Sequence, residues 1–339
     1  KRQGLIKSVD KGSKISIDNG LINFQVLAKD NENLKCKVLD GGTLGSKRHV
    51  NLPGVRVDLP SITKKDRKDI NFGINHNVSF IALSFVRSAG DVLTLRSILK
   101  RKKSAIKIIA KIENQEGLDN IHEITQAADI VMVARGDLGI ETDLADLPNI
   151  QRRIMYASAK WGRRSIVATH LLESMINNPT PTRAEVTDVA NAIYEGADAV
   201  MLSGETSVGK YPIQCIKMLK NIASKTEYFR TLGYEKFLQD NSDWQNIAKG
   251  ARDLAARINA DAIVIITRSG QTANVVSNTK PFRMPIYAFT NNTVTFHQLS
   301  LIGGMQPRFI KSISNQARTI SKIKSCLLYT SPSPRDPIG

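Results

Sequence analysis

A regular alternation of apolar runs and amphipathic stretches constrains the fold of this chain more than any other feature. The apolar runs recur roughly every 25–35 residues, at 78–85, 106–112, 129–134, 165–169 and 198–202. Each is followed by a helical pattern, at 89–102, 116–127, 144–161, 182–195 and 212–226. Strands that alternate with helices in this way are typical of parallel βα units. Five units are visible, whereas a closed βα barrel has eight, so the pattern alone fits part of a barrel or a doubly wound open sheet.

The segments on either side of these units have different patterns. Short strands with tight turns are expected in 13–27 and 35–45, because Asn19-Gly20 is a strong hairpin signal. After about residue 230 an α/β pattern starts again and continues to a helical stretch at 317–325. We therefore predict a β-rich domain, a domain of βα units and a second α/β domain, at residues 1–54, 55–230 and 231–325.

The end of the chain, residues 326–339, does not fit this scheme. The stretch CLLYTSPSPRD (326–336) resembles the translation of a sequencing adapter that was read through in frame. We therefore expect 326–339 to be a non-native tail rather than a native disordered segment rich in Ser and Pro. The chain also opens with Lys1-Arg2-Gln3 rather than with Met, as a fragment would.

Charge and composition argue against several classes of protein. The formal net charge is +17, but the Lys and Arg residues are scattered and no recognised nucleic-acid-binding motif is present. We therefore expect anionic small molecules, rather than a specific nucleic acid, as ligands. No apolar run approaches the roughly 18–20 residues of a membrane span, and the three cysteines lack metal-ligand spacing. These observations predict a cytoplasmic protein without a membrane partner.

Charged side chains end two neighbouring apolar runs. Lys111 and Glu113 lie two residues apart at the end of 106–113, and Asp137 ends 129–137. On a strand, residues i and i+2 point to the same face, so Lys111 and Glu113 look into one space. If Asp137 ends the neighbouring parallel strand, one cation and two carboxylates converge at the same edge of the sheet. That set suits a divalent metal ion and a phosphorylated, anionic substrate.

Polar residues end the other apolar runs as well. Ser84 and Arg87 follow the first run, Thr169 ends the fourth, and Ser203 and Glu205 follow the fifth. Parallel barrels place their active sites at these carboxyl ends of the strands. For Ser203 or Glu205 alone, capping of the following helix is an equally good explanation. A lysine that ends an apolar strand has no such capping role.

Several long segments resemble pyruvate kinases. They are IIAKIENQEG (108–117), IVMVARGDLGIE (130–141), ATHLLESM (168–175), PTPTRAEVTDVANA (179–192) and MLSGET (201–206). That family consists of a βα barrel, a β-rich lid inserted after the third strand, and an α/β regulatory domain. The resemblance therefore implies a partial TIM (β/α)8 barrel with strands four to eight, part of the lid, and a separate, truncated C-terminal α/β domain.

The resemblance also implies roles for the residues at the strand ends. Glu113 and Asp137 would be the protein ligands of Mg²⁺ or Mn²⁺. Lys111 would neutralise charge on the transferring phosphoryl group and on the developing enolate oxygen. Thr169 would place the water that protonates the enolate, and Ser203 would belong to the same proton relay. The substrate carboxylate would be bound by the backbone amides around Ala134, Arg135 and Gly136.

Other implied sites lie outside these strand ends. Lys14 would contact the phosphates of ADP, although an exposed strand lysine is the ordinary explanation. The strand-to-helix turn that binds an effector phosphate in the family corresponds here to Thr267, Arg268, Ser269, Gly270, Gln271 and Thr272. For Arg183 and Glu185, which match a family segment near the active-site rim, a structural salt bridge is an equally good explanation. K⁺ is expected as a second ion, with ligands in the N-terminal part that this chain lacks, and the full-length form is expected to be a homotetramer.

The leading hypothesis is therefore a glycolytic phosphotransferase that converts phosphoenolpyruvate and ADP into pyruvate and ATP. A second hypothesis is another Mg²⁺-dependent barrel enzyme that acts on pyruvate or its enolate, such as an aldolase or a lyase. The lid, the MLSGET segment and the second α/β domain argue against it. A third hypothesis is an inactive fragment, since five strands leave the edges of the sheet open. Val208 also stands where the family often has a nucleotide-facing Lys.

Overall fold

A computed structural model of the chain describes residues 6, 8–18, 20–46, 48–55, 60–311 and 316–330. The chain divides into two compact units, Lys1–Asp240 and Asn241–Gly339. The first unit extends beyond the boundary expected at residue 230, because the short helix η3 (Tyr234–Phe237) packs on the barrel helix α7 (Leu147–Lys160). None of the helices in the described parts of the chain is long and apolar enough to cross a membrane.

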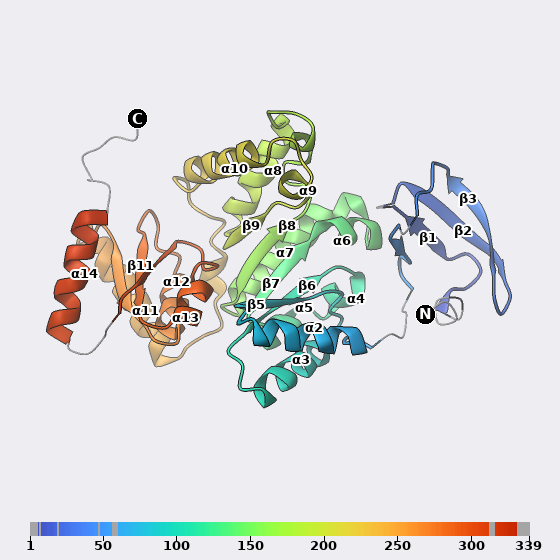
Figure 1. Cartoon of the computed structure of the whole chain (residues 1–339). Coiled ribbons are helices and arrows are strands. Elements are labelled where there is room, and N and C mark those ends of the chain that lie inside the picture. The colour runs from blue at the N-terminus through green and yellow to red at the C-terminus, as the bar shows by residue number, and fades with distance from the viewer. Residues whose placement is uncertain are drawn as a thin grey trace. The chain divides into compact units, whose positions relative to one another are not determined.

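The first unit begins with a four-stranded antiparallel sheet in the order β3-β2-β1-β4 (Figure 1). Its strands are β1 (Lys14–Ile17), β2 (Ile22–Lys29), β3 (Leu34–Asp40) and β4 (Val50–Asn51). β1 and β2 form the expected hairpin, with Ile17 opposite Ile22. Asn19 lies outside the described residues, and Gly20 has φ 84°, a conformation that glycine adopts without a steric cost. A small core around Val9, Ile15, Val26 and Leu52 holds this sheet together.

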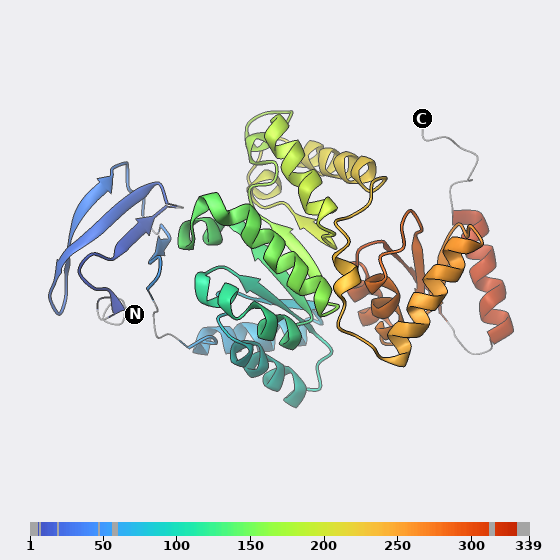
Figure 2. The ribbon, with the colours of Figure 1, turned by 180° about the vertical axis from the view of Figure 1, so that it is seen from behind.

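The rest of the first unit is the partial βα barrel. Its sheet is parallel, with five strands in chain order: β5 (Phe80–Leu83), β6 (Lys107–Ile112), β7 (Ile130–Ala134), β8 (Arg164–Ala168) and β9 (Ala199–Met201). The five apolar runs are therefore the five strands, and the predicted fold class is confirmed. Within the described residues β5 and β9 are the edge strands. Figures 1 and 2 show the helices wrapped around one side of this sheet.

The helices of the barrel follow the strands in the predicted alternation. They are α2 (Lys64–Asn75), α3 (Ala89–Arg101), α4 (Gln115–Asp119), α5 (Ile121–Ala127), α6 (Arg135–Glu141), α7 (Leu147–Lys160), α8 (Arg183–Tyr194), α9 (Gly204–Ser207) and α10 (Pro212–Thr226), with short 3-10 turns η1 (Leu144–Asp146) and η2 (Glu173–Ile176). Helices α3, α5 and α7 pack directly on the strands. Alternate strand residues such as Ile108, Ile112, Val131, Val133 and Val167 face these helices and are fully buried. The residues between them therefore face the inner side of the sheet, because the side chains of a strand alternate.

Local capping fixes where several helices begin. Thr63 and Asp66 form a capping box at the start of α2, and Thr182 and Glu185 form another at the start of α8. Each box satisfies backbone N–H groups that the first turn of a helix otherwise leaves without a partner. The end of α8 is held by the buried Glu195 carboxylate, which joins it to α7 through the bonds described below.

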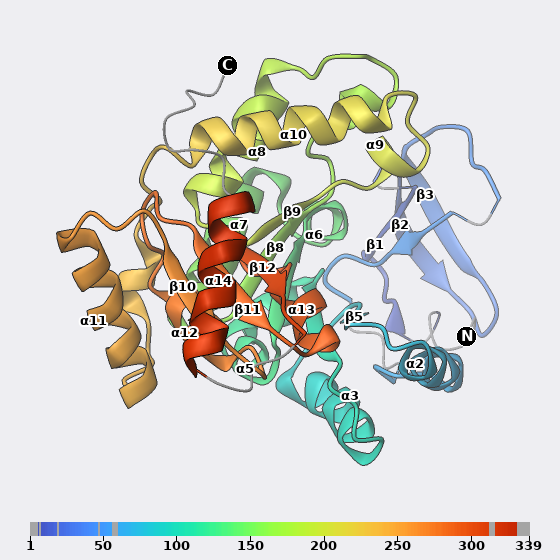
Figure 3. The same ribbon diagram turned by 60° about the vertical axis from the view of Figure 1, so that its left-hand side comes forward.

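The second unit is a smaller α/β domain with a three-stranded parallel sheet. Its strands are β10 (Ile263–Ile266), β11 (Ile286–Thr290) and β12 (Met305–Phe309), and its helices are α11 (Asp243–Arg257), α12 (Gln271–Asn278), α13 (Thr293–Leu299) and α14 (Gln316–Thr330). Figure 3 shows α14 against this sheet. Ile323 of α14 forms a cluster with Tyr287 and Phe289 of β11, and Cys326 and Leu327 pack against this cluster. The last helix therefore continues past residue 325, where the sequence predicted a boundary. Residues 331–339 of the predicted tail lie outside the described residues.

Candidate active site

The predicted pair at the end of β6 forms a close contact. Lys111 Nζ lies 2.5 Å from Glu113 Oε1 and donates to Ser84 Oγ at 3.1 Å. Ser84 follows β5, so the lysine joins the ends of two neighbouring strands. The prediction that Lys111 and Glu113 occupy one space is confirmed, because both lie on the strand face opposite the fully buried Ile112.

Glu113 is a buried carboxylate in an environment that works against its charge. Its side chain is 1% exposed, and its Oε2 accepts from the Phe85 backbone N–H at 2.5 Å. Burial raises the pKa of Glu113 above its ordinary value, and the neighbouring charge of Asp137 adds to this, although the Lys111 and Phe85 bonds lower the pKa. Two carboxylates within electrostatic reach of each other favour the uptake of a cation between them. Phe85 holds its amide in place with a left-handed backbone, φ 51°, which is unusual for an aromatic residue.

Asp137 lies in the first turn of α6, directly after β7. The N–H groups of this turn belong to residues predicted to bind a carboxylate. The Gly136 N–H, however, already donates to Thr169 Oγ1 at 2.8 Å. One of the predicted donors is therefore engaged within the protein, and a bound carboxylate would have to share or displace the Thr169 hydroxyl.

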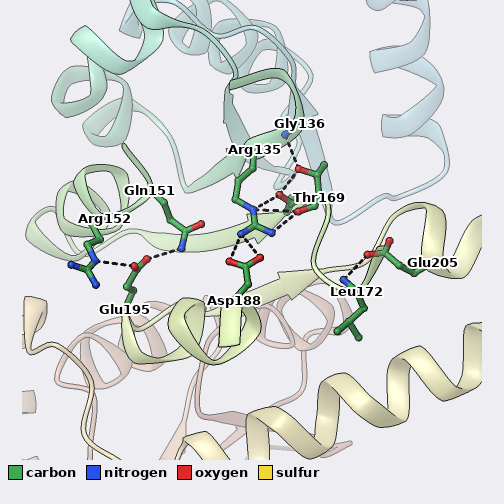
Figure 4. A network of polar contacts seen from close by, with 10 residues as sticks. Arg135, Gly136, Gln151, Arg152, Thr169, Leu172, Asp188, Glu195 and Glu205 are labelled. Carbon is green, nitrogen blue, oxygen red and sulfur yellow. Dashed lines mark hydrogen bonds and ion pairs between the residues drawn. The ribbon is translucent and has the colours of Figure 1, made fainter. Parts of the chain in front are cut away.

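Thr169 follows β8 and faces the start of α6 (Figure 4). Its hydroxyl donates to the Ala168 carbonyl oxygen at 2.6 Å and accepts from Gly136 N–H. Thr169 has φ 72° and the next residue, His170, has φ 53°. A β-branched residue with a left-handed backbone is a genuine outlier, and such residues cluster at functional sites.

The side chain of Arg135 was not predicted as part of the site. It lies beside the Thr169 turn, donates to both Asp188 oxygens at 2.7 Å and reaches the Thr169 carbonyl oxygen at 2.6 Å (Figure 4). The sequence predicted a role only for the Arg135 backbone amide. A signal was present, since Asp188 lies in the segment 179–192 that resembles the family, but nothing in the spacing pairs the two residues.

Glu205 joins the loops after β8 and β9. Its carboxylate is 2% exposed and accepts from the Leu172 N–H at 3.1 Å and the Ser203 N–H at 2.8 Å (Figure 4). Ser203 stands at the N-cap position of α9, but its side chain makes no capping hydrogen bond. The capping explanation therefore does not describe the Ser203 hydroxyl, and Glu205 contacts the Ser203 backbone rather than that hydroxyl.

Glu185 has a structural role that differs from the salt bridge considered with Arg183. Its carboxylate accepts from the Ser174 hydroxyl at 2.5 Å, from the Ser174 N–H at 2.7 Å and from Thr182. Burial raises the pKa of Glu185, but the bonds from Ser174 and Thr182 outweigh it, and the net pKa lies below the ordinary value. Glu185 thus fastens the loop after β8 to the start of α8.

A separate network lies behind the site, on the helices. Glu195, at the end of α8, accepts from Gln151 Nε2 at 2.9 Å and from Arg152 Nε at 3.3 Å (Figure 4). Burial raises the pKa of Glu195 in spite of these bonds. This network holds α7 and α8 together and is not connected to the strand ends by the interactions drawn.

Two predicted sites are located elsewhere. Lys14 is an exposed residue of β1 in the β-rich domain. The predicted effector loop lies in the second unit, between β10 and α12, as the expected strand-to-helix turn. Its Gly270 has φ 82° and donates its N–H to Thr267 Oγ1 at 2.9 Å. That amide is therefore engaged by the loop itself.

The donor set at the ends of β6 and β7 fits a magnesium ion. In the part of the chain that the structure describes, no group of three or more His, Cys, Asp or Glu side chains could hold a metal ion. Mg²⁺ commonly binds through only one or two carboxylates and completes its coordination with substrate oxygens and water. The buried Glu113, with its pKa raised by burial and by Asp137, is the kind of carboxylate whose charge a dication would compensate.

Comparison with known proteins agrees with this arrangement. Residues 1–216 match the family model for the pyruvate kinase barrel domain, and residues 245–330 match the model for the pyruvate kinase alpha/beta domain. Pyruvate kinases of Staphylococcus aureus strains MRSA252 and USA300 are each 46% identical over 311 residues, which cover 90% of this chain and 53% of each relative. The chain thus spans about half the length of these relatives.

A solved structure gives the same result. The crystal structure of a pyruvate kinase from Cryptosporidium parvum superposes with a TM-score of 0.90 at 35% sequence identity, and the match covers 97% of this chain and 69% of that one. The family models together account for both units of the structure. This chain therefore belongs to the pyruvate kinase family.

Proposed function

We propose that this chain carries a site that binds phosphoenolpyruvate and a divalent metal ion for phosphoryl transfer to ADP, which yields pyruvate and ATP. The observation that carries the proposal is the contact between Lys111 and the buried Glu113, with Asp137 at the end of the next strand. Membership of the family supports the same reaction. Because the chain spans about half the length of its relatives, catalysis by this chain alone is part of the proposal.

The two carboxylates and the ammonium group would have different electrostatic roles in the reaction. Glu113 and Asp137 would hold Mg²⁺, or Mn²⁺ in its place, and the ion would supply positive charge to the oxygens of the substrate. Lys111 is held between Glu113 and Ser84. Its charge is therefore fixed in advance, where it stabilises negative charge on the transferring phosphoryl group and the enolate oxygen.

Residues at the end of β8 would assist the protonation of the enolate. After phosphoryl transfer, C3 of the enolate takes a proton from water, the C2–O⁻ becomes the ketone of pyruvate, and the hydroxide that remains is protonated by solvent. A threonine hydroxyl is a poor acid by itself, so Thr169 orients this water rather than supplying the proton. Ser203 belongs to the same relay, and the first-turn amides of α6, at Arg135 and Gly136, together with Ala134, bind the substrate carboxylate.

Several further features belong to the proposal because of the family alone. They are a contact of Lys14 with ADP, an effector phosphate bound at 267–272, a requirement for K⁺, assembly as a homotetramer, and a role in glycolysis in the cytoplasm. None of these is needed for the chemistry of the metal site, and each can fail without affecting it.

The test uses two lysines of the same strand. Lys111→Met removes the ammonium at the site, whereas the control Lys107→Met removes one at the other end of β6, where Lys107 pairs with Asp129 at 3.4 Å. Pyruvate formation is followed through NADH oxidation by lactate dehydrogenase, and Mn²⁺ binding is measured separately by electron paramagnetic resonance. We expect Lys111→Met to lower kcat by about 10²–10³-fold while Mn²⁺ still binds near neutral pH. Equal turnover in the two variants would refute the role of Lys111. Absence of turnover in the unaltered chain, with Mn²⁺ still bound, would identify an inactive fragment with an intact metal site.

A further inference from the structure

The turn after β8 has a strained backbone, which contacts with neighbouring groups must stabilise. Thr169 and His170 both have a left-handed backbone, with φ 72° and 53°. Left-handed conformations cost free energy for all residues except glycine, and a β-branched side chain makes the cost larger. Such residues persist only where the surroundings over-determine them. The Thr169 hydroxyl points at the Gly136 N–H only while this turn keeps its shape.

The Arg135 side chain stabilises this turn through hydrogen bonds. Its Nη2 donates to the Thr169 carbonyl oxygen at 2.6 Å, and its Nε reaches the Thr169 and Ala168 carbonyl oxygens at 3.2 and 3.4 Å. The guanidinium is planar and rigid, so these bonds fix the orientation of the peptide that follows Thr169. The Arg135 side chain is 9% exposed, so water has little access to replace these bonds.

Asp188 in turn fixes Arg135. It lies on α8 and accepts from Arg135 Nη1 with both oxygens at 2.7 Å. An arginine with this charge-assisted pair has little freedom to leave the turn. Figure 4 shows the three residues in a row, from α8 through the guanidinium to the turn after β8. The hydrogen bonds of Asp188 in the described part of the chain go to Arg135, so any effect of Asp188 on the reaction passes through Arg135.

We infer that Asp188 and Arg135 are positioning residues that keep the Thr169 hydroxyl aimed at the start of α6. The inference rests on the proposed function, because it assigns the pair to the proton-transfer half of that reaction. Loss of the pair lets the turn relax toward an ordinary backbone, which moves the hydroxyl away from Gly136. Of the two metal-binding carboxylates, Glu113 follows β6, and Asp137 lies in the first turn of α6, whose helical backbone remains in place without the pair. Protonation of C3 is therefore slowed, whereas the affinity for the metal ion is retained.

The experiment compares two aspartates that pair with arginine at opposite ends of the same strand. Asp188→Asn weakens the pair at the carboxyl end of β8. The control Asp198→Asn weakens the pair at its amino end, where Arg164 Nη1 lies 3.3 Å from Asp198 and both side chains are buried. The first readout is hydrogen exchange of the Gly136 amide, which needs no catalysis. The second is exchange of the C3 protons of pyruvate with D₂O in the presence of Mg²⁺ and ATP, followed by NMR.

We expect Asp188→Asn to lose protection of the Gly136 amide and to slow C3 exchange on the order of tenfold to a hundredfold, with Mn²⁺ affinity unchanged. In Asp198→Asn, the protection of the Gly136 amide and the rate of C3 exchange, each normalised to the amount of folded protein, stay unchanged. Arg135→Lys keeps the positive charge but lacks the planar guanidinium, so we expect this variant also to lose protection of the Gly136 amide. Protection of Gly136 that survives in Asp188→Asn, or is lost equally in Asp198→Asn, would overturn the inference.

A second variant covers the case in which Asp188→Asn folds poorly. His170→Gly places glycine at a left-handed position that glycine adopts freely, so Asp188→Asn/His170→Gly recovers part of the lost protection. Strictly additive effects of the two substitutions contradict the inference, because independent sites add. If the unaltered chain has no C3 exchange while Gly136 protection follows the expected pattern, the proposed function fails for this chain and the positioning role stands.

Discussion

Glu205 offers a direct measure of how strongly the loops behind the site are held. Its buried carboxylate accepts two backbone N–H groups, from Leu172 and Ser203. Glu205→Gln keeps the shape of the side chain but replaces one of its two acceptor oxygens with an NH₂ group, which is a donor. Only one of the two N–H groups can then be satisfied, and the other faces an NH₂ group.

The expected loss follows from this count of donors. Leaving a buried donor without a partner costs about 1–3 kcal/mol, so Glu205→Gln should lower the free energy of unfolding by about that amount. The Ser203 N–H is the less buried of the two donors, so the amide should turn its oxygen to Leu172. Glu205→Ala abandons both donors and should cost about 2–6 kcal/mol. In a unit of this size, each kcal/mol corresponds to about 2–4 °C in Tm.

The chain contains two tryptophans, which allows unfolding of the first unit to be followed separately. Trp161 lies in the first unit, and Trp244 lies on α11 of the second and is 58% exposed. In a Trp244→Phe background, urea unfolding followed by Trp161 fluorescence reports on the unit that contains Glu205. Glu173→Gln is the matched control, because Glu173 directly follows Leu172 in the segment after β8 but is 54% exposed. A Glu205→Gln variant as stable as the Glu173→Gln control would refute the reasoning.

Two further predictions concern ionisation and capping. Because burial and Asp137 raise the pKa of Glu113 above 4.5, Mn²⁺ affinity should fall on acidification at a higher pH than for an ordinary glutamate, and Glu113→Gln should abolish this pH dependence. Because the folded metal-free state binds that proton more tightly than the unfolded state, its free energy of unfolding should rise as the pH falls through the raised pKa toward 4.5. Urea unfolding at several pH values measures this for wild type and for Glu113→Gln. A difference in unfolding free energy between the two that changes with pH in the opposite direction would contradict the assignment. Thr182→Ala removes the N-cap of α8 and should cost about 1 kcal/mol, whereas Thr187→Ala, on the exposed side of the same helix, should cost less; equal losses would show that the cap is unimportant.

Local spacing was enough to predict the part of the site that lies on one strand. Lys111 and Glu113 are two residues apart, and the period of a strand alone puts them on one face. The five apolar runs likewise predicted the strands, because buried parallel strands are continuously apolar. These inferences need no knowledge of the rest of the molecule.

The contacts that complete the site could not be predicted in this way. Arg135 and Asp188 are distant in sequence, and only the folding of the barrel brings α8 to the start of α6. Glu205 was considered as a strand-end site residue or a helix cap, but its bonds go to backbone N–H groups of two loops, which leave no trace in a sequence pattern. The end of α14 differs from the predicted helical stretch because 326–339 was grouped by composition, whereas Cys326 and Leu327 pack with the apolar side chains of the second unit.

The strand order of the barrel also bears on how this site can change over evolutionary time. Lys111 and Glu113 are supplied by β6, Asp137 follows β7 and Thr169 follows β8, so each group arrives on its own βα unit. Separate units usually allow one loop to be replaced while the others are retained. The Arg135 contact removes that freedom for the last two units and for α8. Substitutions at Arg135 and Asp188 should therefore have been accepted in pairs, while the β6 unit, which supplies Lys111 and Glu113, lies outside this coupling.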